Sequence, residues 1–498
     1  LRMSQKNLRI LWCYPNQHLR VTPPGGIAII TACLKRAGYT NIELFDATWF
    51  PMDENLKSAR TDRDKERAKR GMIPEYSWDG FGYRIENIDM YTAWRMKIEE
   101  YKPDVVISSL VEDTYFMWLK MMSKISDLKH TFTHIVGGVF PTAAPEYFVD
   151  HCDYICRGEG DEAIPEMMDL IAEGKSCKNV PNVFPNQIRP ALDVETLPYT
   201  DHTIFPDKAL YRPFQGKIVK IATIETQRGC PFKCAYCNSP GKSVIYENED
   251  AGKFFRRRSV KHIRGEIVDL IEKHQITVAW IVTDTLLTMP PKEFDEFCDM
   301  WEEFKLPFFA QTRPELLTPY QAKRLKEVGC AKINIGVEHG CPDFRKKYIG
   351  RVYKNTLPIK AFKIAHDAGL STTCNFIFGY PYETMDDAFK SIVLASKLRS
   401  QDLNGFIFTP YHGTPLRRLA AEAGFIPNDL IVDMRNDDAG SYLKMPPPYM
   451  SANDIQYMHD NYVRMVRELE DGMEVDELKE KLKKRTSFVN KEGWIGIK

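Results

Sequence analysis

Three cysteines in one short segment have the most specific chemistry in this sequence. The segment ETQRGCPFKCAYCNSPGK places Cys230, Cys234 and Cys237 in a C-x3-C-x2-C arrangement. Three thiolates on one loop can bind three irons of a 4Fe–4S cubane and leave the fourth iron open to a substrate. The alternatives are a structural zinc ion, which normally takes four ligands, and three unrelated buried cysteines. The nearest other cysteines are Cys177 and Cys298, so the spacing favours the cluster.

A series of alternating strands and helices must position this loop. Apolar runs predict strands at 218–226, 278–284, 307–311, 331–337, 370–378 and 404–409. Amphipathic patterns predict the intervening helices at 259–275, 290–304, 319–328, 355–368 and 384–400. Units of this kind in series predict a full or partial (β/α)6 barrel with its chemistry at the carboxyl ends of the strands. The cysteine segment directly follows the first of these strands.

The N-terminal region also alternates between strands and helices. Short apolar strands fit 8–13, 42–46, 104–109, 133–137 and 153–156, and helical patterns fit 25–37, 115–128 and 161–173. Such alternation predicts a Rossmann-like, doubly wound parallel sheet with helices on both faces. A ligand would then bind beyond the carboxyl ends of the strands. The fold class is therefore α/β: this sheet, then the barrel, then a helical C-terminal tail.

Composition shifts divide the chain into segments. We predict an N-terminal domain at 1–173 with an insertion at 52–100, a proline-rich linker at 174–217, a barrel at 218–415 and a helical region at 416–498. The insertion begins with a charge run from Lys57 to Arg70, typical of a solvated helix. Its aromatic residues should pack against the fold or form a lid; they are Tyr76, Trp78, Phe81, Tyr83, Tyr91 and Trp94. The tail sequence RELEDGMEVDELKEKLKKR predicts one charged amphipathic helix with a solvated face.

Composition excludes several classes of function. Lys+Arg and Asp+Glu both number 68, so no net charge attracts nucleic acid or an anionic membrane. No apolar run approaches the ~20 residues of a membrane span, and the first residues lack the features of a signal peptide. The 12 cysteines are mostly scattered, which predicts a reducing cytoplasm rather than a disulfide scaffold.

The cysteine segment resembles the radical SAM superfamily. The resemblance rests on C-x3-C-x2-C after the first barrel strand, with Tyr236 just before the last cysteine. It implies that the open iron chelates S-adenosylmethionine (SAM), that reduction of the cluster yields methionine and a 5′-deoxyadenosyl radical, and that Tyr236 packs near the adenine. It also implies a low-potential electron donor such as flavodoxin or ferredoxin.

Other landmarks of that superfamily follow in order. Glu338 in INIGVEHG resembles the acid that contacts SAM, and Arg313 in QTRPELL fits a polar SAM contact. Gly379 and Pro381 in FIFGYPYET resemble the glycine motif near the adenine. Taken alone, Glu338 or Arg313 would more often be a paired barrel charge; their placement at successive strand ends makes a SAM contact equally good. His412, in the turn PYHGTPL, is expected to be structural rather than catalytic.

Small residues lie at the predicted strand ends of the first domain. Ser108 and Leu110 are followed by Gly137 and Gly138, which leave room for a flat ligand or its nucleotide tail. A generic nucleotide or a tight turn would fit as well. The spacing resembles the cobalamin-binding fold, and RGEGDEAIPEM resembles a segment of cobalamin-binding radical SAM proteins. The resemblance implies a cobalamin site formed by Pro24, Gly25, Ser108, Leu110, Gly137, Gly138, Thr142, Gly158 and Glu159.

One motif of classical cobalamin domains is missing. The sequence has no D-x-H-x-x-G, whose histidine ligates cobalt, and His18 does not lie in that pattern. We therefore expect cobalamin without a histidine on cobalt. Gly138 is expected to make room for the cofactor tail, so Gly138→Ala should be mild and Gly138→Val severe for cobalamin binding alone.

The two implied cofactors predict an enzyme. Most members of the resembled subfamily are methyltransferases that move a methyl group from methylcobalamin to an unactivated carbon. The alternatives are a radical SAM cyclase or oxidase, a non-catalytic cobalamin or iron–sulfur carrier, and a radical SAM enzyme whose first domain has lost cobalamin. The substrate, a small molecule or a peptide, is not readable from the sequence.

Overall fold

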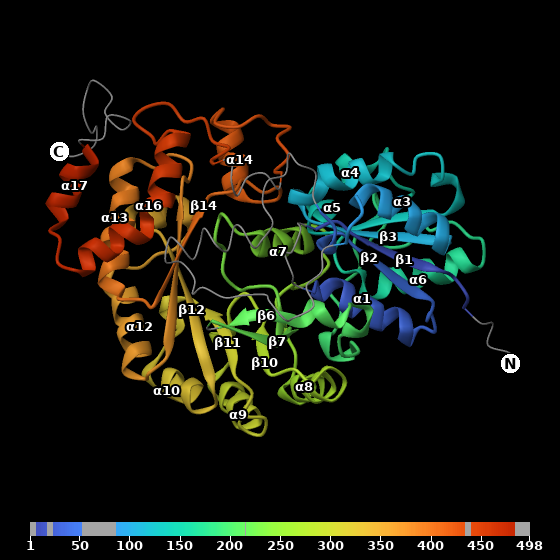
Figure 1. Cartoon of the computed structure of the whole chain (residues 1–498), viewed down its shortest axis with the longest axis horizontal. Coiled ribbons are helices and arrows are strands. Elements are labelled where there is room, and N and C mark those ends of the chain that lie inside the picture. Colours follow the sequence, from blue (N-terminus) through green and yellow to red (C-terminus); the bar gives the residue numbers. More distant parts are fainter. Residues whose placement is uncertain (1–5, 17–22, 52–85, 215, 434–439, 484–498) are drawn as a thin grey trace.

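The computed structural model describes residues 6–16, 23–51, 86–214, 216–433 and 440–483. Figure 1 shows two lobes: an N-terminal lobe around β1–β5, and a larger lobe that contains the later strands and ends in the C-terminal helices. No helix in the described ranges is long and apolar enough to cross a membrane.

The N-terminal lobe is built on a five-stranded parallel sheet, as predicted. Its strands are β1 Ile10–Tyr14, β2 Ile42–Asp46, β3 Val105–Leu110, β4 Thr133–Gly138 and β5 Tyr154–Cys156. They lie in the order β2-β1-β3-β4-β5. The strand order reverses between β1 and β3, which is where doubly wound sheets bind ligands, at the carboxyl ends.

Helices cover both faces of this sheet because its strands are apolar on both sides. Helices α1 Gly25–Arg36 and α6 Gly160–Ala172 pack on the face that carries Trp12 and Ile107. Helices α3 Met90–Tyr101 and α4 Tyr115–Ser123 pack on the face that carries Val106 and Leu110. A short helix, α5 Val139–Ala143, follows β4 directly.

The end of the predicted insertion belongs to this core. Tyr91 and Trp94 of α3 are buried in the same cluster as Trp118 of α4, which confirms the packing prediction for these two aromatic residues. The charge run and the other four aromatic residues lie outside the described residues.

The second lobe is a half-barrel of parallel strands, as predicted. Its strands are β7 Lys217–Ile224, β10 Val278–Ile281, β11 Phe308–Thr312, β12 Cys330–Glu338, β13 Ser371–Phe378 and β14 Asp402–Ile407. Neighbours in sequence are neighbours in the sheet, from β7 to β14. The predicted linker ends in β6 Tyr211–Phe214, which pairs antiparallel with β7, so its last residues extend the barrel sheet.

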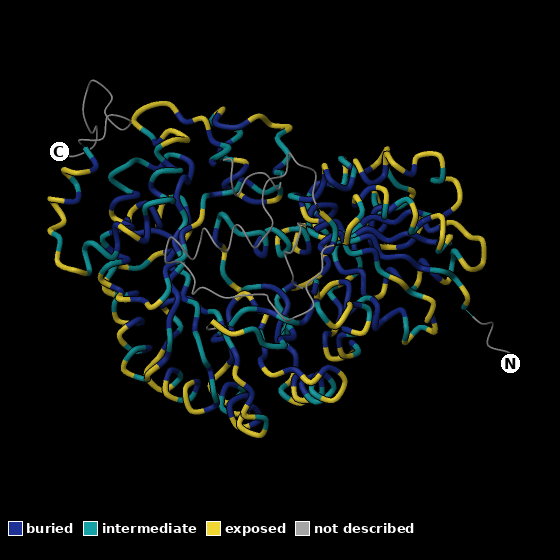
Figure 2. The backbone as a smooth tube through the Cα atoms, viewed as in Figure 1, coloured by how far each residue is buried: buried dark blue, intermediate teal, exposed yellow. Residues whose placement is uncertain are grey.

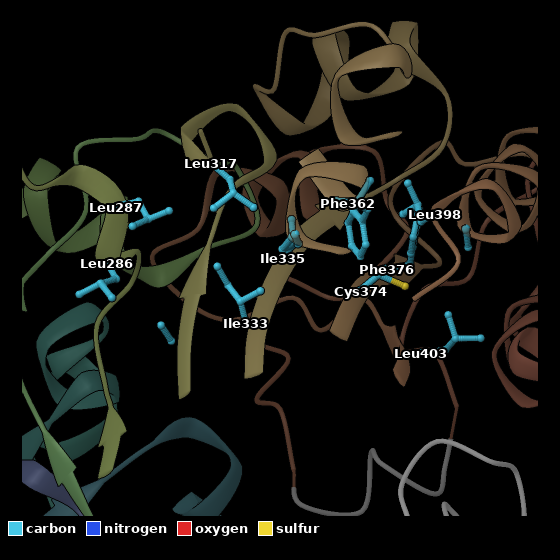
Figure 3. Packing of buried hydrophobic residues seen from close by; sticks show 14 of the residues in the cluster. Leu286, Leu287, Leu317, Ile333, Ile335, Phe362, Cys374, Phe376, Leu398 and Leu403 are labelled. Carbon is cyan, nitrogen blue, oxygen red and sulfur yellow. The ribbon is translucent and has the colours of Figure 1, made fainter. Parts of the chain in front are cut away.

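The predicted helices lie on one face of the half-barrel. They are α8 Val260–His274, α9 Pro291–Glu302, α10 Pro319–Glu327, α12 Thr356–Asp367 and α13 Met385–Leu398. Alternate strand residues such as Ile335 and Phe376 pack with Phe362 of α12 and Leu398 of α13 (Figure 3). Figure 2 shows the strands as mainly buried and the outer helices as exposed on their far sides. Smaller elements are α7 Asn238–Asn248, α11 Pro342–Phe344, β8 Gln227–Arg228 and β9 Arg256–Arg257.

The C-terminal region is helical, but its charged segment is not one helix. It forms α14 Pro415–Glu422, α16 Ala452–Glu470 and α17 Val475–Lys483. The predicted single helix is broken at Gly472, which has φ +104° and lies in the turn between α16 and α17. Leu478 and Leu482 of α17 are buried against the barrel core. The prediction of one continuous helix was therefore wrong, whereas α17 is amphipathic with a solvated face, as predicted: its two buried leucines, one turn apart, form the packing side, and most of its charged residues are exposed.

Candidate active site

The three cysteines lie on the loop between β7 and α7, at the carboxyl end of the first barrel strand. Cys234 is buried and its two partners are half-buried. The loop is held from both sides, because Ala235 N–H donates to the carbonyl of Ile349 (3.0 Å) and its own carbonyl accepts from Leu416 N–H (3.1 Å). Segments after β12 and β14 thus fix the conformation of the cysteine loop.

Burial keeps the thiols of Cys230 and Cys237 protonated in the absence of metal. It raises the pKa of Cys230 to about 11 and that of Cys237 to about 12. Binding of iron would therefore release protons. In the described ranges no three His, Cys, Asp or Glu side chains converge on a single metal ion. Thiolates on a cubane bind different irons, so they need not converge on one point.

Arg313 lies beside the cysteine loop, as the predicted SAM contact should. Its Nη1 donates to Cys234 Sγ at 3.3 Å, and its guanidinium lies 3.8 Å from the ring centroid of Phe232. It also forms an ion pair with Glu315. A cation next to a thiolate offsets negative charge, so Arg313 can stabilise the charge of a bound cluster.

Tyr236 and Glu338, two further predicted SAM contacts, meet through Arg351. Arg351 Nη2 donates to Tyr236 Oη at 2.9 Å and lies 3.4 Å from Glu338 Oε1. Burial raises the pKa of Glu338, and the charge of Arg351 opposes this effect. Glu338 also has φ +73°, a strained conformation for a residue other than glycine, which costs about 1–3 kcal/mol and is typical of functional sites.

Buried polar atoms without partners mark the space beside these residues. Tyr380 Oη and Arg351 Nε are buried and form no hydrogen bond with any described residue. The Tyr380 ring lies 6.1 Å from that of Tyr236. Buried polar groups are nearly always satisfied, so these two atoms are candidates for hydrogen bonds to a polar ligand such as SAM.

An exposed carboxylate near the cysteines fits the other end of SAM. Asp284, which follows β10, accepts from Ser239 Oγ at 2.6 Å. Burial is the main cause of the raised pKa of Cys230 and Cys237, and the negative charge of Asp284 raises the pKa of both further. An ammonium group is the natural partner for such a carboxylate, and SAM carries one at its amino-acid end.

Gly379 and Pro381, the last predicted SAM residues, lie in the turn that carries Tyr380. Gly379 has φ +82°, and a Cβ there would come 2.7 Å from Ile455 of α16. Glu383 anchors the turn by accepting from Tyr380 N–H at 3.0 Å and from His339 Nε2 at the same distance. Gly379 and Pro381 therefore shape the turn, and Tyr380 provides the aromatic ring that lies beside Tyr236. Sequence analysis missed Asp284, Arg351 and Tyr380.

We expect Arg351→Met to lower the affinity for SAM about ten-fold or more. The variant keeps the length of the side chain but leaves the buried Glu338 carboxylate without its cation. Arg351→Lys retains the positive charge and should lose less affinity for SAM. Equilibrium dialysis with SAM on cluster-loaded protein measures the effect. Equal SAM binding in wild type and Arg351→Met, at equal iron content, would show that Arg351 only supports the fold.

The N-terminal sheet presents an open edge at its switch point. Pro24 caps α1, and Gly25 and Gly26 begin it; a Cβ added at either glycine would meet nothing within 4 Å. Val111, just beyond β3, is 45% exposed. Small residues and an exposed apolar side chain at this edge fit a large flat ligand such as cobalamin. His18, in the preceding loop, lies outside the described residues.

Two of the predicted cobalamin residues face the core instead. Ser108 is fully buried, and its hydroxyl accepts from Trp118 Nε1 (3.1 Å) and lies 2.9 Å from His134 Nε2. Leu110 is buried in the cluster on the α4 side. Gly137 is half-buried, and a Cβ there would make only ordinary contact with Cys156. A cofactor role for these three residues stays a prediction.

Gly138 is required by the backbone. It has φ +114°, and a Cβ there would lie 2.5 Å from the carbonyl oxygen of Leu110. The expectation that Gly138→Ala is mild is therefore wrong. We expect Gly138→Ala to lower the melting temperature of the cofactor-free protein, at a cost of about 1–3 kcal/mol. Gly25→Ala, at an open helical position, should not lower it. Equal melting temperatures for Gly138→Ala and wild type would favour the earlier explanation, in which the glycine makes room for the cofactor tail.

The remaining predicted cobalamin residues lie where the two lobes meet. Thr142 Oγ1 donates to the Gly138 carbonyl (2.7 Å) and accepts from Gly158 N–H (3.0 Å). The next amide, Glu159 N–H, donates to Tyr246 Oη of α7 at 3.0 Å. This segment therefore joins the ends of β4 and β5 to the helix that follows the cysteine loop.

A buried ion-pair network completes this contact. Arg228, two residues before Cys230, donates to Glu159 (2.7 Å) and to both oxygens of Asp161 (2.9 Å each). Arg256 donates to both Glu159 oxygens, at 2.7 and 2.9 Å. We call Glu159, Asp161, Arg228 and Arg256 the interlobe clamp. Both Glu159 oxygens are occupied by arginines, so its carboxylate ties the cysteine loop to the first lobe.

A second set of contacts joins the two lobes at the carboxyl ends of their strands. Glu112, just beyond β3, accepts from the backbone N–H of His412 (2.8 Å) and of Val432 (2.9 Å). Asp113 accepts from Tyr411 Oη at 3.1 Å. The His412 ring packs 5.2 Å from that of Phe140. These contacts support the structural role expected for His412, and they hold the carboxyl ends of β3 and β14 against each other.

Comparison with known proteins agrees with this geometry. Residues 224–394 match the Radical SAM superfamily, and residues 79–168 match the B12 binding domain. An uncharacterized methyltransferase, PH0819 of Pyrococcus horikoshii, is 27% identical over 68% of this chain and 72% of its own length. An anaerobic magnesium-protoporphyrin IX monomethyl ester cyclase of Cereibacter sphaeroides is 22% identical over 82% of this chain and 63% of its own.

A solved structure has the same fold along most of the chain. The radical S-adenosylmethionine methyltransferase TsrM of Kitasatospora setae, with cobalamin and a [4Fe-4S] cluster bound, superposes with a TM-score of 0.61. The match covers 92% of this chain and 88% of TsrM at 16% identity. The two family matches show that the chain contains a radical SAM domain with a B12-binding domain in front of it.

Proposed function

We propose that the chain is a cobalamin-dependent radical SAM methyltransferase that methylates an unactivated carbon of a small molecule. One observation carries the proposal: the carboxyl edges of the two sheets face each other and are joined by the interlobe clamp and by the Glu112 contacts. A substrate between these edges would lie within reach of both cofactor sites. The cluster with SAM supplies a 5′-deoxyadenosyl radical, and cobalamin supplies the methyl group.

In this proposal the chain's own residues bind and orient. Cys230, Cys234 and Cys237 hold the cluster, and Arg313 offsets its charge. We assign SAM contacts to a set that adds three residues to the predicted ones and has Asp284 at the amino-acid end; the set is Tyr236, Asp284, Glu338, Arg351, Gly379, Tyr380 and Pro381. On the other side, Pro24, Gly25 and the ends of β3 and β4 support the corrin edge. The clamp fixes the separation of the two sites.

The reduction of the cluster needs an external partner. We propose a low-potential flavodoxin or ferredoxin as the electron donor, and a reducing cytoplasm as the location. All twelve cysteines lie in described residues and are free thiols, without a disulfide among them, which supports a reducing compartment.

Anaerobic reconstitution tests the proposal. Protein loaded with iron, sulfide and hydroxocobalamin should contain about one cobalamin and one 4Fe–4S cluster per chain, and should form 5′-deoxyadenosine from SAM and a reductant. The absorbance spectrum after desalting gives cobalamin content. A protein that forms 5′-deoxyadenosine but retains no cobalamin would contradict the proposal and favour a first lobe that binds substrate only. Cofactor binding without methylated product would favour ring formation, as in the related cyclase.

A further inference from the structure

The inner face of the half-barrel is polar. We define it as the face of β11–β14 opposite the helices, since residues such as Ile333, Ile335 and Cys374 point to the helical side (Figure 3). Side chains alternate along a strand, so the inner face carries the residues between them. Its polar members are Gln311, Lys332, Asn334, Thr373, Asn375, Asp402 and Asn404.

Four carboxamides form the middle of this face. Gln311 is in register with Asn334, and Asn375 is in register with Asn404. All four are partly exposed. Asn404 Nδ2 donates to Asn375 Oδ1 at 3.1 Å, and Gln311 Nε2 donates to the Thr283 carbonyl. The pairs lie on four adjacent strands, so they form one continuous surface.

Some hydrogen-bond donors and some acceptors of this surface have no partner among the described residues. Within the described ranges, the Asn334 side chain makes no hydrogen bond, Asn375 Nδ2 donates to nothing, and Gln311 Oε1 accepts from nothing. Donors and acceptors are therefore both available to a ligand. A hydrocarbon surface would leave them unpaired, which is unfavourable.

The charges on this face are already paired. Lys332 forms an ion pair with Asp402 at the amino end of the strands. Glu338 is paired with Arg351 at the carboxyl end. Asp284 lies at the cysteine loop, where the ammonium group of SAM would meet it. Among the described inner-face residues, no formal charge is left for a phosphate or a carboxylate.

Apolar residues border the carboxamides at the two ends. Ile377 and Phe406 are in register one step nearer the SAM site, and Phe406 is 42% exposed. At the other end Trp280 and Phe309 pack with ring centroids 6.0 Å apart. An aliphatic carbon would thus meet apolar side chains near the SAM site, while the rest of the molecule meets amides.

We propose that this inner face binds the substrate, and that the substrate is an uncharged molecule rich in hydroxyl or amide groups, with its reacting carbon at Ile377 and Phe406. The inference rests on the proposed methyl transfer and adds the substrate class. A site built from hydrogen-bonding side chains rejects analogues that cannot pair with them. Lipids and polyanions are therefore the classes that this face excludes.

The test uses cofactor-loaded protein and SAM with a deuterated methyl group. The reaction contains extract of the organism that carries the gene, and is afterwards partitioned between chloroform and aqueous methanol. We expect the labelled product in the aqueous phase, unretained by both anion and cation exchangers. Label in chloroform, or label retained by either exchanger, would overturn the substrate class while leaving methyl transfer intact. Normal 5′-deoxyadenosine formation without any labelled product would overturn methyl transfer and the substrate class together.

Variants then locate the site. Asn334→Leu and Asn375→Leu keep side-chain size but remove the amide, and each should lower labelled product about ten-fold, since one lost hydrogen bond that leaves its partner unpaired is worth about this factor. Asn428→Leu, at an exposed position outside the barrel strands, is the control and should match wild type. Undiminished product from both inner-face variants would place the substrate elsewhere.

Discussion

Replacing any one of Cys230, Cys234 and Cys237 by alanine is expected to abolish the 4Fe–4S absorbance and the formation of 5′-deoxyadenosine. Each thiolate binds a different iron, and two thiolates cannot hold a cubane that must also leave one iron open. The loop itself should keep its conformation, because its hydrogen bonds to Ile349 and Leu416 come from the backbone of Ala235. Iron and sulfide analysis after anaerobic reconstitution measures the loss.

Two buried cysteines elsewhere provide the controls. Cys177 lies in the core of the first lobe and Cys298 in that of the barrel. Their alanine variants should keep full iron content. If a variant at any of the three loop positions retained full iron and full SAM cleavage, the cluster assignment would be wrong.

Arg228→Ala is expected to destabilise the protein by about 3–5 kcal/mol, because it leaves the buried Asp161 carboxylate without its cation and leaves Glu159 paired with Arg256 alone. The Asp161 side chain is 4% exposed and that of Glu159 is 8% exposed, so water cannot replace the guanidinium. Thermal unfolding of wild type and variant measures the difference. Asp161→Asn, a smaller change, should lower the amount of methylated product per 5′-deoxyadenosine, since it loosens the contact that fixes the distance between the two cofactor sites.

A surface arginine gives the matched comparison. Arg264 pairs with Glu303, and both side chains are about half exposed, at 50% and 47%. Loss of such a pair costs about 0–1 kcal/mol, so Arg264→Ala should melt close to wild type. Two results would together show that other contacts hold the lobes together. One is an Arg228→Ala protein with the same melting temperature as Arg264→Ala, and the other is an Asp161→Asn protein with the wild-type ratio of methylated product to 5′-deoxyadenosine.

Local sequence patterns predicted most of the architecture. Each predicted barrel strand and helix appears within a few residues of its predicted range, because alternating burial and helical periodicity are properties of short segments. The tail was the exception: Gly472 interrupts a charge pattern that continues on both sides of it. A pattern of charges contains no information about a left-handed backbone conformation.

The residues of the candidate site were predictable where they lie at the end of a predicted strand. Arg313 and Glu338 could be placed because Arg313 directly follows β11 and Glu338 is the last residue of β12. Arg351 could not, since it reaches Tyr236 from a turn beyond α11. Glu159 was assigned to cobalamin because its segment resembles a cofactor motif, whereas its carboxylate pairs with arginines from the other lobe. Pairing across 69 residues of sequence has no local signature.

One active site between the lobes is expected to couple radical formation to methyl transfer. The most direct measurement gives reconstituted protein a purified substrate and SAM with a deuterated methyl group, and quantifies 5′-deoxyadenosine, S-adenosylhomocysteine and product by mass spectrometry. We expect equal amounts of all three, with the intact labelled methyl group in the product and no product from protein without cobalamin. Labelled product in undiminished amount from the cobalamin-free protein, or product without 5′-deoxyadenosine, would contradict it.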